Sequence, residues 1–358
     1  MHNFNFNLLK NLLEIPSYSG DCTAMQCYII DYAKKKGWDI VDDEVGNLYI
    51  VKGESETFPC VVAHLDTVHR ILPGGIQAVM VGSNIITGIN PWSMKQTGIG
   101  GDDKCGVFAA LEILNILPKC KVALFVDEEV GCVGSSKCRM DFFNDCRFVL
   151  QTDRRGNSDF VTDICGPLSS DEFQDDVFSY LQKYGFRHAD GMMTDVQALR
   201  DRGVGISSAN ISSGYYNPHQ DNEYIRIDDL KNTLNLMLDI CMNMTNVYKF
   251  EYEDRYSMSS YYGHGWSSSH SSNKGGKKEW TDEDFDLKWQ QKYGIIPDDE
   301  EEPTIDRVDF QHKSISEMTD AEWLEFQLDV DDTIDDETFR LQEWLRDNSE
   351  HIKSILTH

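Results

Sequence analysis

The chain has 358 residues and a formal net charge of −28, from 61 acidic and 33 basic side chains. Nucleic acids and anionic membranes would repel a chain this acidic, so neither is expected as a partner. The acidity is uneven, because much of it lies beyond Glu251.

Cysteine usage and the N-terminus predict a cytoplasmic protein. The ten cysteines include no Cys-x-x-Cys pair, and several, such as Cys60 and Cys241, lie in apolar runs. This is typical of buried, reduced thiols. Residues 1–6 lack the basic segment and apolar core of a signal peptide, and no apolar run approaches the length of a membrane helix.

Hydrophobic patterns predict one α/β domain over residues 1–248, which is ample for a single core. Helices are expected first, at 8–13 and 24–36. Further along, the pattern predicts buried strands at 60–63, 122–126 and 148–150 and a buried helix at 106–114. We expect a mixed, mostly parallel sheet flanked by helices on both faces.

Polar residues that suit a metal site follow the three predicted strands. They are His64 and Asp66 after the first strand, Glu128 and Glu129 after the second, and Asp153 after the third. We expect the third strand to end just before Asp153. Functional residues gather at the carboxyl ends of strands in open α/β sheets. The side chains are therefore expected at one edge of the sheet.

A glycine-rich turn precedes another candidate ligand, Asp102. Gly98, Gly100 and Gly101 let the backbone fold tightly before Asp102, which is expected near a helix start, where a carboxylate is favoured. Two Zn²⁺ ions about 3.5 Å apart need a bridging carboxylate, with imidazole and carboxylate ligands on each side. Asp102 is the candidate bridge.

Each motif has an ordinary explanation when it is taken alone. A His-x-Asp pair is usually chance, adjacent glutamates usually lie on a solvated helix face, and Asp-Asp-Lys after glycines commonly caps a helix. Their joint occurrence, in this order and after apolar strands, favours a metal site.

Together the motifs resemble those of the co-catalytic zinc exopeptidases, which include peptidase T, carboxypeptidase G, aminoacylase, acetylornithine deacetylase and succinyl-diaminopimelate desuccinylase. The resemblance extends from about Leu8 to Met244 and implies a zinc exopeptidase-like fold. It also implies two zinc ions, one held by His64, Asp102 and Asp153 and the other by Asp102, Glu129 and His219.

The resemblance also implies roles for residues that are not metal ligands. Glu128 matches the general base, and Asp66 matches the carboxylate that orients His64. Residues 194–199, 203–206 and 215–225 resemble the closing stretch of the family, in which a helix, a strand and a loop present the last histidine. Asn222-Glu223-Tyr224, after His219, is part of that signature and is expected to be a structural support for the loop.

The chain departs from the family in one large way. The stretch between Asp153 and His219 is too short for the inserted domain that relatives use for dimerisation and as a lid. A lid-mediated dimer is therefore not expected, and the oligomeric state is left open. The lid histidine that helps to stabilise the oxyanion is also lost, and His188, Tyr215 and Tyr216 are the candidate replacements.

The expected reaction is hydrolysis of the N-terminal peptide bond of a small peptide. Aminopeptidase members of the resembled family carry Asp at the position of Asp153, and the Asp102-Asp103-Lys104 triplet looks most like peptidase T. Co²⁺ or Mn²⁺ suits the same ligands as Zn²⁺. Deacylation of an N-acyl amino acid is the alternative activity. A third hypothesis is an inactive fold that binds a partner through its C-terminal extension, although buried carboxylates without metal would destabilise it.

The composition changes after the predicted domain. Residues 249–305 are rich in Ser, Gly and acidic side chains and are expected to be a linker, with His264 and His270 solvated. Residues 306–358 are expected to be an acidic helical extension, in which Trp323 and Trp344 belong to apolar positions at helical spacing. This extension is expected to dock on the domain, to mediate association, or to be a weakly ordered tail.

Overall fold

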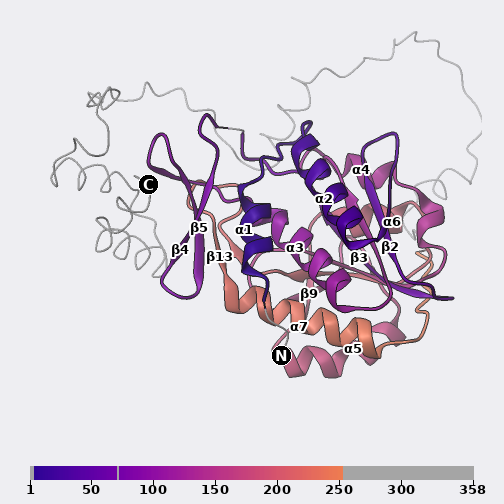
Figure 1. Ribbon diagram of the computed structural model, residues 1–358. Helices are drawn as coiled ribbons and strands as arrows, with labels where there is room; N and C mark the ends of the chain where they lie inside the picture. Colours follow the sequence, from indigo (N-terminus) through magenta and orange to yellow (C-terminus); the bar gives the residue numbers. More distant parts are fainter. Residues whose placement is uncertain (1–3, 71, 253–358) are drawn as a thin grey trace, which may run out of the picture. The chain divides into compact units, whose positions relative to one another are not determined.

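The computed structural model describes residues 4–70 and 72–252 (Figure 1). The predicted linker, apart from residues 249–252, and the predicted extension at 306–358 lie outside the described residues. In the parts of the chain that the structure describes, no helix is both long and apolar enough to span a bilayer.

An eight-stranded sheet with the order β1-β2-β7-β3-β8-β11-β9-β10 forms the centre of the domain. Its strands are β1 Asp39–Asp42, β2 Leu48–Lys52, β3 Phe58–His64, β7 Cys120–Phe125, β8 Cys146–Arg154, β9 Asp159–Asp163, β10 Arg187–Asp190 and β11 Ser208–Ser212. The four strands β7, β3, β8 and β11 are parallel, β9 and β10 are parallel to each other, and the remaining pairs are antiparallel. The predicted mixed, mostly parallel sheet is confirmed, with β1 and β10 at its edges.

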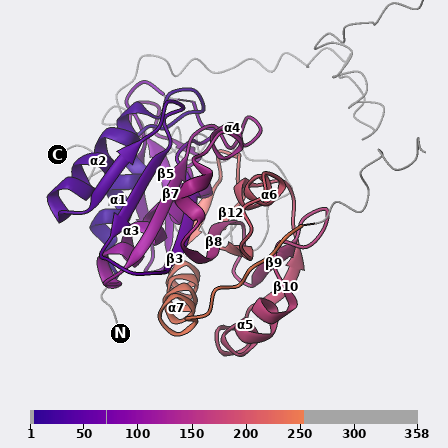
Figure 2. The same ribbon diagram turned by 90° about the vertical axis from the view of Figure 1, so that its right-hand side faces the viewer.

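Helices cover both faces of this sheet. They are α1 Phe6–Glu14, α2 Thr23–Lys36, α3 Gly101–Ile116, α4 Val133–Ser136, η1 Met140–Phe143, α5 Asp171–Tyr184, α6 Asp195–Asp201 and α7 Ile227–Asn243. Helices α1, α2, α3, α5 and α7 contribute to one apolar core, while α6 and the 3₁₀ helix η1 contribute to the other. Figure 2 shows α5 and α7, which pack against each other.

The strand β3 illustrates why the central strands are continuous apolar runs. All seven of its residues are buried, because a parallel sheet with helices on both faces exposes neither side to water. Val61 and Ala63 pack into one core, and Cys60 and Val62 pack into the other. His64 is the last residue of the strand, as predicted.

A second, smaller sheet was not predicted. Its strands are β4 Gln77–Val81, β5 Ile85–Asn90, β6 Lys95–Thr97, β12 Tyr215–Tyr216 and β13 Tyr224–Arg226. They pair antiparallel in the order β12-β13-β5-β4, with β6 paired to β5. Because β13 pairs with β5, the loop that carries His219 lies beside the segment that leads from β6 into α3.

Two predicted strand boundaries are wrong. The strand β8 runs through Asp153 to Arg154 instead of ending before Asp153. The strand expected at 203–206 is β11, Ser208–Ser212. Four of the five residues of β11 are polar or small, so hydrophobicity does not reveal this strand. Its side chains instead bond to the main chain, as Asn210 Nδ2 does to the carbonyl of Asp153 at 2.7 Å.

The stretch between Asp153 and His219, all of which the structure describes, forms no separate domain. Its strands β9, β10 and β11 belong to the large sheet. At the other end of the domain, packing continues past the predicted boundary at 248, since Phe250 N donates to the carbonyl of Gly205 at 3.1 Å.

Candidate metal centre

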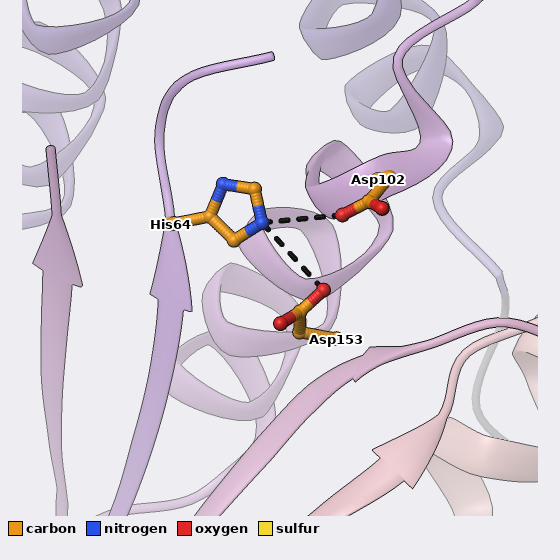
Figure 3. Close-up of side chains that lie close together, drawn as sticks. All are labelled: His64, Asp102 and Asp153. Carbon is orange, nitrogen blue, oxygen red and sulfur yellow. Dashed lines mark hydrogen bonds and ion pairs between the residues drawn. The ribbon is translucent and has the colours of Figure 1, made fainter. Parts of the chain in front are cut away.

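The first predicted ligand set converges at the carboxyl ends of the parallel strands (Figure 3). His64 Nε2 lies 3.2 Å from Asp102 Oδ1 and 3.6 Å from Asp153 Oδ1. The three residues come from the end of β3, the start of α3 and the end of β8. One possible ligand atom from each lies within 4.8 Å of the others, so a single ion could contact all three.

The second predicted set shares one residue with the first. His219 Nε2 lies 3.3 Å from Asp102 Oδ2 and 3.1 Å from Glu129 Oε2. Asp102 therefore turns one carboxylate oxygen toward each set, which is the arrangement that a bridging ligand needs. All five predicted ligands are brought together.

Asp103 fixes the position of the shared carboxylate. Regular helical geometry begins after Asp102 and Asp103, whose backbone angles are not helical. The Asp103 carboxylate accepts from Gly106 N at 3.0 Å and from His64 N at 3.2 Å, so it both caps the helix and joins it to β3. A Cβ at Gly106 would lie 2.4 Å from those carboxylate oxygens. This role of Asp103 was not predicted.

Asp66 does more than the sequence predicts. His64 Nδ1 is 3.0 Å from the carbonyl oxygen of Asp66 and 3.4 Å from its carboxylate, so the main chain is the nearer partner of the imidazole. The carboxylate accepts from Glu128 N at 3.0 Å, Glu129 N at 3.3 Å and Ser19 Oγ at 2.8 Å. Asp66 thus fixes the loop that carries Glu128. Ser19 was not singled out from the sequence.

Three donors surround the carboxylate of Asp153. Thr194 Oγ1 donates to Oδ2 at 2.6 Å, Gln151 Nε2 approaches the same oxygen at 3.4 Å, and Tyr215 OH donates to Oδ1 at 3.3 Å. The alternation along β8 places Gln151 and Asp153 on one face of the strand. Neither Thr194 nor Gln151 had been assigned a role at the site.

Of the three candidate oxyanion donors, only Tyr215 contacts the cluster. Tyr216 OH donates to Asp229 Oδ2 at 2.7 Å. His188 lies on the edge strand β10, with Nδ1 3.3 Å from Thr162 Oγ1.

The cluster concentrates negative charge away from water. Burial raises the pKa of Glu128 to about 9 and that of Asp153 to about 6. Asp102 and then Glu129 raise the pKa of His219 to about 10. Burial alone would lower the pKa of His64, but its hydrogen bonds to neighbouring carboxylates raise it well above its usual value. All four of these pKa values are raised. The cluster therefore disfavours further negative charge and favours the binding of cations.

The donor set fits divalent metal ions. Among the described residues, the buried atom Glu129 Oε1 has no hydrogen-bond partner, although buried carboxylate oxygens normally have one. Two imidazoles and three carboxylates are the ligands that Zn²⁺, Co²⁺ and Mn²⁺ accept. These five residues could therefore hold two ions.

Comparisons with known proteins give one short sequence match. No protein-family model matches the chain. A [LysW]-lysine hydrolase from Deinococcus radiodurans is 32% identical over 66 residues, which is 18% of this chain and 18% of the length of that relative.

Solved structures match over a much longer stretch. A tripeptidase from Staphylococcus aureus aligns over 66% of this chain and 96% of its own, with 15% identity and a TM-score of 0.53. Aminopeptidase PepT from Bacillus cereus covers the same shares at 14% identity and a TM-score of 0.55. An aminopeptidase from the archaeon Desulfurococcus kamchatkensis aligns over 66% of this chain and 93% of its own, with 16% identity and a TM-score of 0.53. The chain therefore has the zinc exopeptidase-like α/β fold that its motifs predict.

Proposed function

We propose that the protein is a metal-dependent peptidase that hydrolyses the N-terminal peptide bond of small peptides. The observation that carries this proposal is the shared carboxylate of Asp102, which lies 3.2 Å from His64 and 3.3 Å from His219 through different oxygens. Two donor sets that meet at one carboxylate suit a pair of ions rather than a single one.

Zn²⁺ is the metal that we assign to both positions. One ion would be held by His64, Asp102 and Asp153, and the other by Asp102, Glu129 and His219. When bound, such a pair polarises the scissile carbonyl and makes water a better nucleophile near neutral pH.

We assign the proton transfers to Glu128. Burial makes its carboxylate a stronger base than an exposed glutamate, and the hydrogen bond from its own amide to Asp66 at 3.0 Å fixes its backbone. The carboxylate would take a proton from the attacking water and deliver it to the leaving amine. The proton taken from water ends on the leaving nitrogen, so the amine leaves neutral and Glu128 is ionised again.

Tyr215 is our candidate donor to the oxyanion. Its hydroxyl is at the cluster, 3.3 Å from Asp153 Oδ1, whereas the hydroxyl of Tyr216 is bonded to Asp229. Removal of one such donor typically costs about 10²–10³ in kcat. A Tyr215→Phe variant should therefore lose turnover even at metal concentrations that saturate the site, and unchanged turnover would contradict the assignment.

The proposed substrate class rests on Asp153 and on the similar structures. Asp153 matches aminopeptidase members of the resembled family, and the similar solved structures are named as a tripeptidase and aminopeptidases. An N-acyl amino acid presents the same amide bond, so deacylation is the alternative that an assay must separate. The inactive binding fold is not favoured by these likenesses.

The test is metal content together with a substrate panel. Wild type, Glu128→Ala and the exposed-site control Glu54→Ala would be measured by mass spectrometry for bound metal. The same proteins would be assayed with dipeptides, tripeptides and N-acetyl amino acids. We expect two ions in all three proteins and a fall of roughly 10³-fold in peptide hydrolysis for Glu128→Ala alone. Cleavage of acetyl amino acids alone would establish the deacylase, and a chain that binds no divalent metal would contradict the proposal.

A further inference from the structure

The glycine-rich segment before Asp102 rests on one buried carboxylate, that of Glu223. The side chain of Glu223 is fully buried. Its Oε2 accepts from Gly100 N at 2.7 Å, and its Oε1 accepts from Asp102 N at 3.1 Å. These two amides flank Gly101, so a single side chain fixes the main chain on both sides of the residue that precedes the shared ligand.

A second side chain, His69, holds Glu223 from the other direction. His69 Nε2 lies 2.9 Å from Glu223 Oε2, and only 12% of the His69 side chain is exposed. The imidazole lies directly on Gly98, where an added Cβ would come within 1.8–2.3 Å of three ring atoms. A larger side chain at position 98 would therefore clash with the ring of His69.

These contacts join three chain segments, each of which carries a predicted ligand or leads into one. His69 follows His64 and Asp66 on the segment after β3, and Glu223 follows His219 on the loop between β12 and β13. The glycine segment lies between them and leads into Asp102. A change at this pair would displace the carboxylate that belongs to both donor sets.

We infer that His69 and Glu223 form a positioning pair that sets the affinity of the protein for both metal ions through Asp102. The inference rests on the proposed dinuclear centre. A residue that only supported the loop would not be expected to affect both ions. The inference predicts that the affinities for both ions fall together. Outer residues that orient metal ligands typically contribute about 10–100-fold in metal affinity.

A matched control lies on α3, the helix that begins at this segment. Glu112 is as buried as Glu223, and its carboxylate accepts hydrogen bonds from the side chains of Asn115 at 2.9 Å and Asn5 at 3.5 Å, away from the glycine segment. Both glutamates are expected to contribute to the stability of the fold. Glu223, in addition, accepts a hydrogen bond from the main chain of the predicted ligand Asp102.

The experiment compares wild type, Glu223→Gln, His69→Phe and Glu112→Gln in the full-length chain. After circular dichroism has shown that each is folded, Co²⁺ is titrated into the metal-free proteins, and both affinities and the visible absorption spectrum are recorded. We expect both Co²⁺ affinities to fall at least tenfold for the first two variants, with an altered spectrum, and to stay at wild-type values for Glu112→Gln. His69→Phe keeps a ring over Gly98, so it tests the hydrogen bond without emptying the space.

Gly98 supplies an independent check. Gly98→Ala should weaken Co²⁺ binding by displacing the imidazole, whereas it should have little further effect in a His69→Gly background, because the ring is already absent. Full additivity of the two changes would overturn the inference, as would wild-type affinities in Glu223→Gln and His69→Phe or equal losses in Glu112→Gln. A wild-type chain that binds no Co²⁺ and no Zn²⁺ would overturn the proposed function as well.

Discussion

The buried side chain of Asn47 bonds to both ends of the loop that carries Glu128 and Glu129, which are also joined by the hydrogen bond from Gly134 N to the carbonyl of Val126 at 3.0 Å. Its Oδ1 accepts from Val126 N at 3.1 Å, and its Nδ2 donates to the carbonyl of Gly134 at 3.0 Å. Asn47 is fully buried. The loop therefore depends on a residue that lies far away in the sequence and contacts no predicted ligand.

Replacement of Asn47 by Ala should destabilise the fold by about 2 kcal/mol, since it leaves the buried Val126 N–H without a partner at roughly 1–3 kcal/mol. The carbonyl of Gly134 keeps its hydrogen bond from Lys137 N at 3.1 Å. For a domain of this size the corresponding fall in Tm is about 6 °C. The affinity for the ion that Glu129 would bind should fall as well, because Asn47 holds the ends of the loop at Val126 and Gly134.

The assay is urea denaturation of the metal-free protein, followed by metal titration of the folded protein. Asn90→Ala is the control, because Asn90 is also buried and also bonds to main-chain groups, including the carbonyls of Pro73 and Gly75 at 2.9 Å. It should lower stability and leave metal affinity unchanged. A loss of less than 1 kcal/mol in Asn47→Ala, or equal effects of the two variants on metal binding, would refute the reasoning.

Three further outcomes are expected. Thr194→Val removes the 2.6 Å hydrogen bond to Asp153 and should weaken one of two metal-binding steps in calorimetry by about tenfold; two unchanged steps would contradict this. The pKa of His219 is raised to about 10 by neighbouring carboxylates, so a metal must displace its proton, and affinity should fall as the pH is lowered. Calorimetry in buffers of different ionisation enthalpy should detect the released proton, and identical heats would count against it. Among the ten cysteines only Cys27 and Cys165 are exposed, so iodoacetamide should add two groups to the native protein, and a larger number would show that buried thiols are accessible.

His64, Glu128 and Glu129 could be found from the sequence because they end or follow strands with an unambiguous signal. The strands β3 and β7 are buried at every position, so their apolar runs mark where each strand ends. His64 ends the first of these strands, and Glu128 and Glu129 follow the second within a few residues. Parallel pairing of the two strands then brings these residues to one edge of the sheet.

The supporting residues could not be found in this way. Ser19 lies in a segment with no metal-site pattern, and it reaches the carboxylate of Asp66 only because the fold brings it there. The pair His69 and Glu223 is separated by more than half of the domain. A single sequence contains no signal for such contacts, although Glu223 was recognised as part of a loop signature.

The second sheet was missed for a related reason. The strand β4 is only partly buried along most of its length, so the alternation between apolar and polar positions is weak. The two-residue strand β12 is too short to produce any period. Pairing with distant strands stabilises both, and sequence periodicity does not report such pairing.

The two edges of the large sheet have a consequence for how the protein behaves at high concentration. Among the described strands, β1 and β10 each have four residues, three of them exposed, and both carry charged side chains at their ends. Short, charged edges are poor templates for an incoming extended chain. Strand-by-strand growth into fibrils should therefore be slow to start at either edge. Replacing Asp39 and Asp42, or Arg187 and Asp190, with Val would remove this protection and should make the folded protein prone to edge-to-edge aggregation.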